Sequence, residues 1–77
     1  MSKQAGGHPA RQDERTAKLF RAMKHTVELV RDLDGALSED AMLCLKAAAL
    51  GQMQAYSELT GLPAPVTIIN NRWDLAA

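Results

Sequence analysis

One stretch constrains this chain more than any other: residues 41–50 are apolar except for Lys46. A helix that packs against a single neighbour needs an apolar stripe on one side only. If this stretch is helical, its apolar residues lie nearly all round the helix. We therefore expect it to be buried on several sides, against a second helical hairpin or another protein.

The ends of that helix can be located from its capping residues. Ser38 can accept hydrogen bonds from free amides at a helix start, and two acidic residues follow in the first turn, where they complement the helix dipole. Gly61 can adopt the left-handed conformation beyond the last turn, and Pro63 cannot continue a helix. The sequence predicts a helix over residues 39–60 that ends in a Schellman motif.

An earlier helix is predicted over about residues 12–33. Its apolar residues recur at steps of three and four and are Leu19, Phe20, Met23, Val27 and Val30. Asp34 and Gly35 mark its end. Two helices joined by so short a link pack antiparallel as an αα-hairpin, here residues 12–62. Residues 1–11, with two glycines and a proline, are expected to form a flexible leader.

After the hairpin, residues 63–77 are predicted to be an extended arm and tail. Residues 66–69 are β-branched and favour a short strand or ordered arm, and Asn70-Asn71 favours a turn or loop. The strand has the composition to pair with a sheet edge or with its own copy. The expected fold class is all-α, a helical hairpin with an extended C-terminal arm.

The length of 77 residues makes an independent core marginal, so we expect a dimer or higher oligomer. Cys44 is the only cysteine, which excludes an intrachain disulfide. Neither Cys44 nor His8 and His25 form a metal-ligand spacing, and no cofactor is predicted.

The second helix carries the candidate interface with a partner or with a second copy. Its apolar contact residues are Met42, Leu45, Met53 and Tyr56. Small residues at steps of four form a ridge that would let another helix approach closely, and they are Ala47, Gly51 and Ala55. Alanine also simply favours helix, which is the alternative explanation. Gly51 argues against it, because glycine within a helix costs about 1 kcal/mol relative to alanine.

Trp73, the only tryptophan, has two possible roles. It either folds back over the hairpin core or anchors a partner. Both alternatives stay open at this point, with folding back favoured.

Residues suited to catalysis are few. His25 precedes Glu28 by one helical turn, but no serine or cysteine is placed for activation, so an exposed pair is favoured. Cys44 lies between two leucines, which predicts a buried and inert thiol. We therefore predict that the chain is not an enzyme.

The nine basic and nine acidic residues cancel in number but not in position. Residues 26–62 are mainly acidic, whereas the first helix is basic. Its candidate nucleic-acid-binding residues are Arg11, Arg15, Lys18, Arg21 and Lys24. They are suited to phosphates, an acidic protein surface or the acidic half of a second copy, or they form a solvated face. The one aromatic residue among them, Phe20, belongs to the apolar side of the helix, which disfavours single-stranded nucleic acid.

Residues 56–68, Tyr-Ser-Glu-Leu-Thr-Gly-Leu-Pro-Ala-Pro-Val-Thr-Ile, resemble the region where the long helix of phage small terminase subunits ends before an extended segment. The resemblance implies an oligomeric helical ring that binds DNA and recruits the packaging motor. No N-terminal helix-turn-helix is recognisable in this chain. Residues 37–40 followed by an alanine-rich helix are faintly similar to the Hha-type nucleoid modulators.

The leading hypothesis is a small non-enzymatic interaction module that binds itself and another protein through its second helix. A regulator or inhibitor of phage or mobile-element type fits this size. The alternative is a DNA-associated packaging or nucleoid component that uses the basic first helix. A third hypothesis, an enzyme using His25 or Cys44, is not favoured. No segment is long and apolar enough to span a membrane, and a cytoplasmic location is expected.

Overall fold

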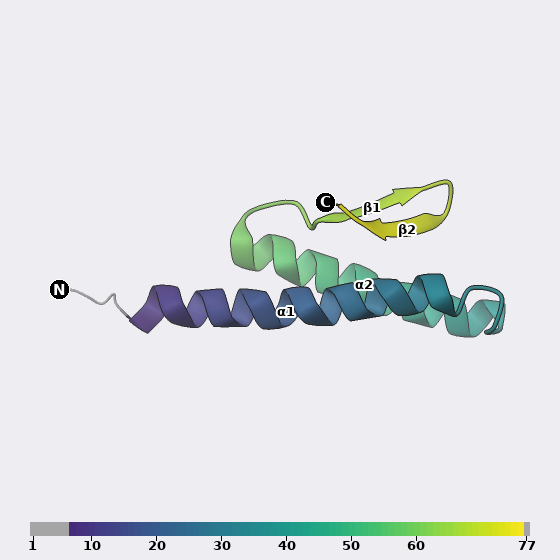
Figure 1. The fold of residues 1–77 in the computed structure, drawn as a ribbon, viewed down its shortest axis with the longest axis horizontal. Helices are drawn as coiled ribbons and strands as arrows, with labels where there is room; N and C mark the ends of the chain where they lie inside the picture. Colours follow the sequence, from purple (N-terminus) through teal and green to yellow (C-terminus); the bar gives the residue numbers. More distant parts are fainter. Residues whose placement is uncertain (1–6, 77) are drawn as a thin grey trace.

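The computed structural model describes residues 7–76, and for residues 7–13 it describes the backbone alone. Two helices pack antiparallel and a two-stranded hairpin lies over them (Figure 1). The elements are α1 (Gly7–Asp32), α2 (Glu39–Thr60), β1 (Val66–Ile69) and β2 (Arg72–Leu75). The molecule is elongated, about 54 × 20 × 16 Å, because α1 runs past the end of α2. The predicted helical hairpin is confirmed.

Helix α1 begins at Gly7, five residues before its predicted start, so residues 7–11 of the expected flexible leader are helical. Pro9 is compatible with this start, because the first backbone N–H groups of a helix have no partner within it and their loss costs little. Residues 1–6 of the expected leader lie outside the described residues. The helix ends before Gly35, whose φ of 85° reverses the chain.

Helix α2 has the predicted bounds and caps. The Ser38 hydroxyl accepts a hydrogen bond from the backbone N–H of Ala41 at 3.2 Å. Gly61 is left-handed, with a φ of 73°, and its N–H donates to the Ser57 carbonyl at 2.8 Å. The Leu62 N–H donates to the Thr60 hydroxyl instead of closing a second backbone bond. The stop is therefore the simpler left-handed motif, which corrects the predicted Schellman motif.

The molecule is mostly helical, as predicted, but it is not purely all-α, because the C-terminal residues form a β-hairpin rather than one strand and a tail. β1 and β2 pair antiparallel, with Ile68 opposite Trp73 and Ile69 opposite Arg72. Asn70 and Asn71 have φ values of 53° and 64°. Positive φ at both central positions is the pattern of a type I′ turn, whose twist matches that of the flanking strands. The predicted turn at these residues is confirmed.

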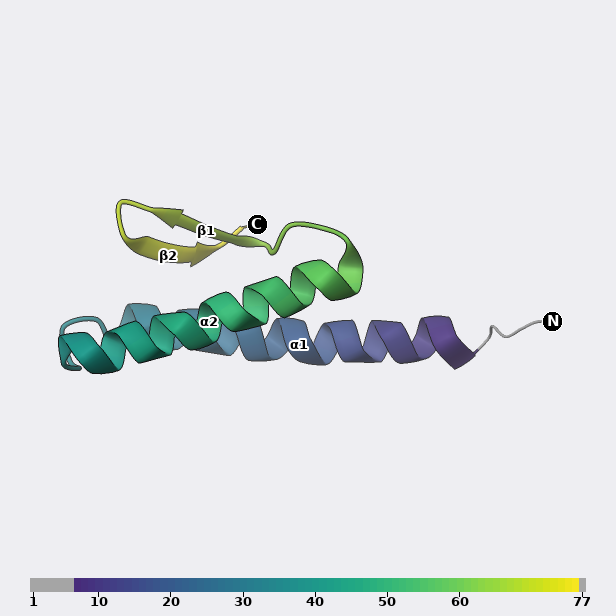
Figure 2. The ribbon, with the colours of Figure 1, turned by 180° about the vertical axis from the view of Figure 1, so that it is seen from behind.

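The core lies where the β-hairpin packs over the two helices (Figure 2). Its buried members are Val27, Val30, Met42, Ala49 and Trp73, with Leu33, Leu45, Met53 and Val66 packed around them. Trp73 is 5% exposed, so the favoured alternative, folding back over the helices, is correct. The tryptophan closes the core from above, because β2 packs on α1.

Polar contacts fix the β-hairpin to each helix. Arg31 of α1 pairs with Asp74 of β2 at 3.3 Å, and Arg72 also pairs with Asp74, at 3.0 Å. Lys46 of α2 donates to the Asn71 side chain at 3.2 Å. The one charged residue in the apolar stretch of α2 therefore holds the turn of the β-hairpin.

Candidate interaction surface

The face of α2 that points toward α1 and the β-hairpin is already covered within the protomer. Met42 and Ala49 are buried, and Leu45 and Met53 pack against them as half-buried members of the core. Tyr56 is half-buried, and its ring lies 6.4 Å from that of Phe20 in α1. The four predicted apolar contact residues thus belong to the core or its edge, as does Trp73. The candidate interface has to be redrawn without them.

The opposite face of α2 is open and apolar. Its predicted small residues Ala47, Gly51 and Ala55 are all exposed. Leu43 and Leu50, which lie beside them at helical steps of three and four, are 60% and 50% exposed. We call these five residues the outer face of α2. Of the predicted interface residues, the small ones therefore lie on this exposed side of the helix, and the large apolar ones lie on the covered side.

The lone cysteine is also on the open side of α2. Cys44 is exposed, which corrects the expectation of a buried thiol. The two neighbouring leucines that motivated that expectation point in different directions, because successive residues of a helix are about 100° apart. His25 is exposed on α1, but among the described residues no ion pair joins it to Glu28. Within residues 14–76, no group of three histidine, cysteine or acidic side chains is arranged to hold a metal ion.

Gly51 is not explained by packing inside the protomer. A Cβ atom built on Gly51 meets nothing within 4 Å, and its φ is not in the region that requires glycine. Glycine in a helix interior costs about 1 kcal/mol relative to alanine. Alanine would therefore fit this protomer and stabilise its helix.

Acidic residues lie at both ends of the outer face. Asp40 and Glu58 are exposed. They lie on the same side of the helix as Ala47 and Gly51, because steps of three, four and seven residues keep to one helical face. Eighteen residues of helix separate them by about 27 Å. Glu58 accepts a hydrogen bond from the Gln54 amide at 3.3 Å and makes no ion pair among the described residues. The outer face is thus apolar in its middle and negative at its ends.

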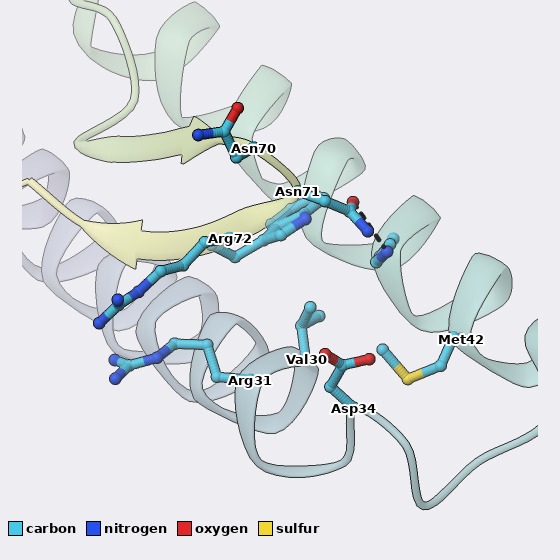
Figure 3. A pocket seen from close by; sticks show the side chains of 9 residues that line it. Val30, Arg31, Asp34, Met42, Asn70, Asn71 and Arg72 are labelled. Carbon is cyan, nitrogen blue, oxygen red and sulfur yellow. Dashed lines mark hydrogen bonds between the residues drawn. The ribbon is translucent and has the colours of Figure 1, made fainter.

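A hollow of about 400 Å³ lies between the turn of the β-hairpin and the adjoining helix ends (Figure 3). Its three cationic side chains are already engaged by groups of the protein, whereas Asp34 makes no ion pair among the described residues. The guanidinium groups of Arg31 and Arg72 point away from Asp34 and Met42 in Figure 3 and share Asp74. Lys46, the third cation of the lining, donates to the turn. The hollow therefore offers little free positive charge to an anionic ligand.

The basic residues of α1 are on its surface. Arg15, Lys18, Arg21 and Lys24 are exposed, and none of them makes an ion pair within the described part of the chain. The side chain of Arg11, the fifth predicted member, lies outside the described residues. The structure therefore leaves these four cations available to an external anion.

Comparison with protein-family models, curated proteins and solved structures found no match to this chain. The resemblance to small terminase subunits and to Hha-type modulators stays a prediction. No helix within the described residues is long and apolar enough to cross a membrane.

Proposed function

We propose that this protein is a small non-enzymatic interaction module that docks a helix of another molecule on the outer face of α2. The observation that carries the proposal is Gly51. This glycine lies in the middle of α2, a Cβ atom at its position would meet nothing, and glycine lowers the stability of the helix. A helix that approaches α2 closely would explain the missing side chain. The approaching helix belongs to another protein or to a second copy of the chain.

The leucines beside Gly51 supply the favourable energy for such docking. Leu43 and Leu50 are at least half exposed, and burying a leucine side chain completely contributes about 1.5–3 kcal/mol. The small residues beside the two leucines let a partner helix come near enough to cover both. A surface of this kind suits a regulator or inhibitor that acts by occupying a partner protein, of the phage or mobile-element type that the size suggests.

A pair of variants at Gly51 tests the docking surface. Gly51→Leu adds a large side chain where the Cβ position is open, so we expect it to abolish association while the helical circular dichroism is retained. Gly51→Ala is the matched control, because it adds one methyl group and improves helix propensity. Association is measured by light scattering of the purified chain and by affinity capture from the source organism. Unchanged mass and unchanged captured proteins in Gly51→Leu would contradict the proposal.

A second candidate function is DNA association through α1, which the four exposed and unpaired cations of this helix favour. Basic side chains that displace counterions from phosphates bind DNA in a salt-dependent way. We expect Arg15→Glu combined with Arg21→Glu to abolish a DNA mobility shift at low salt, while Gly51→Leu leaves it unchanged. Failure of the native chain to shift duplex DNA even at low salt would remove this candidate.

A further inference from the structure

We infer that the helix docked on the outer face of α2 is a basic amphipathic helix of another protein. This inference rests on the proposed function and adds the chemistry of the partner. It is carried by the distribution of charge around the outer face, together with the two exposed leucines.

Charge complementarity selects a basic partner. The exposed charged residues of α2 are acidic, namely Glu39, Asp40 and Glu58, whereas Lys46 is half-buried and donates a hydrogen bond to the turn of the β-hairpin. A partner helix that lies along the outer face meets negative charge at both ends of its path. Lysine or arginine at its two ends and apolar residues between them would match this arrangement.

Glu58 is the acidic residue of the outer side that the helix dipole does not explain. The acidic residues at the start of α2 are favoured by the helix dipole, so the fold itself accounts for them. Glu58 lies in the last turns, where the dipole disfavours negative charge, and the last turn contains no basic residue. A cation from a docked helix would offset this unfavourable position.

A second copy of the chain does not provide that match. If two α2 helices pair antiparallel on their outer faces, Asp40 of one lies opposite Glu58 of the other at both ends. If they pair in parallel, each acid meets its own copy. Both orientations bring like charges together around the leucines.

Helix α1 of a second copy is basic but does not supply the apolar residues. None of the exposed large hydrophobic side chains of the described residues lies on α1. The leucines of the outer face would therefore meet the polar side of that helix, whereas a basic amphipathic helix from another protein supplies both the apolar residues and the cations.

A set of three synthetic peptides tests this inference on the full chain. Each peptide has about 18 residues, enough to span roughly 27 Å as a helix, and shares one leucine and alanine stripe. Lysine, glutamine or glutamate occupies the same positions near both ends. Fluorescence anisotropy measures binding at about 50 mM and about 500 mM salt. We expect the lysine peptide to bind tightest and the glutamate peptide weakest, with the difference reduced at high salt.

Two variants assign the binding to the outer face. Glu58→Lys is expected to weaken binding of the lysine peptide by about threefold and to strengthen binding of the glutamate peptide. An effect of this size is typical of an exposed charge pair. Glu14→Lys makes the same charge change on the exposed surface of α1 and is expected to change neither affinity. Leu50→Gln is expected to weaken the lysine peptide by about tenfold or more.

The outcomes separate this inference from the proposed function. If the lysine and glutamate peptides bind equally well and Leu50→Gln abolishes both interactions, the inference of a basic partner is wrong. The proposal that the outer face docks a helix is then retained. Self-association without peptide that Leu50→Gln abolishes makes a second copy the occupant and also overturns the inference of a basic partner. If no peptide binds and the chain does not self-associate, the inference fails, and the proposed function then depends on the captured proteins alone.

Discussion

On the inner side of α2, Met42 is 7% exposed, whereas Leu43, the next residue, is 60% exposed on the outer side. Both residues are large and apolar, and both belong to the same helical turn. They differ because α1 and β2 cover one side of the helix and no described element covers the other. Apolar composition alone therefore does not distinguish a core position from an exposed position on α2. The direction in which each side chain points relative to the neighbouring elements makes that distinction.

The largest expected effect comes from removing the residue that closes the inner side. Trp73→Ala should cost about 3–5 kcal/mol of unfolding free energy, because a buried aromatic ring leaves a cavity between the β-hairpin and both helices. Urea unfolding followed by circular dichroism measures this loss. Trp73→Phe is the control and should cost much less, because the indole Nε1 is buried without a hydrogen-bond partner. Equal losses in both variants would contradict this account of the core.

The adjacent pair of residues gives the most direct test of the comparison. Met42→Ala should cost about 2–5 kcal/mol, whereas Leu43→Ala should change the unfolding free energy by about 0.5 kcal/mol or less. Both variants are measured in urea at a low protein concentration, so that association does not contribute. Similar costs at the two positions would show that the two sides of α2 are not different in the free protomer.

A smaller and opposite effect is expected on the outer side. Gly51→Ala should raise the unfolding free energy of the protomer by up to about 1 kcal/mol, because the added methyl group meets nothing and alanine favours helix. The shift in the midpoint of urea unfolding reports this gain. A loss of stability would mean that Gly51 is required by the protomer itself.

The smallest effect concerns the ion pairs that hold the β-hairpin over the inner side. Asp74→Asn removes the shared partner of Arg31 and Arg72, all three of which are partly exposed. Pairs with this exposure contribute about 1 kcal/mol or less. We therefore expect a loss below about 1 kcal/mol, which decreases as salt is raised from 50 mM to 500 mM. A larger loss would show that the β-hairpin is held mainly by charge rather than by Trp73.

The helices were predictable because their signals are local. Ser38 and Gly61 mark the ends of α2 through hydrogen bonds to residues three or four positions away, and these contacts need no knowledge of the rest of the fold. The early start of α1 was missed because Gly and Pro near a terminus usually indicate loop, whereas Pro9 lies in the first turn, where it is tolerated.

The β-hairpin was half predicted. Asn70-Asn71 is predicted to be a turn or loop, but residues 72–77 are assigned to a tail, although Trp73 and Leu75 are apolar. Their alternation with charged residues is the period-two pattern of a strand and could have been recognised. The side of α2 that forms the core could not be recognised from the sequence. It depends on where β2 packs, which brings together residues about thirty positions apart, such as Met42 and Trp73.

Burial of the sole tryptophan also gives the molecule an intrinsic optical probe. Indole emission moves to longer wavelength when the ring enters water, and Trp73 is the only residue that can produce this signal. Fluorescence therefore reports the docking of the β-hairpin, while far-ultraviolet circular dichroism reports mainly the helices. Coincident transitions would mean that strands and helices unfold in one step, and separate transitions would identify a helical pair that persists after the hairpin has left it.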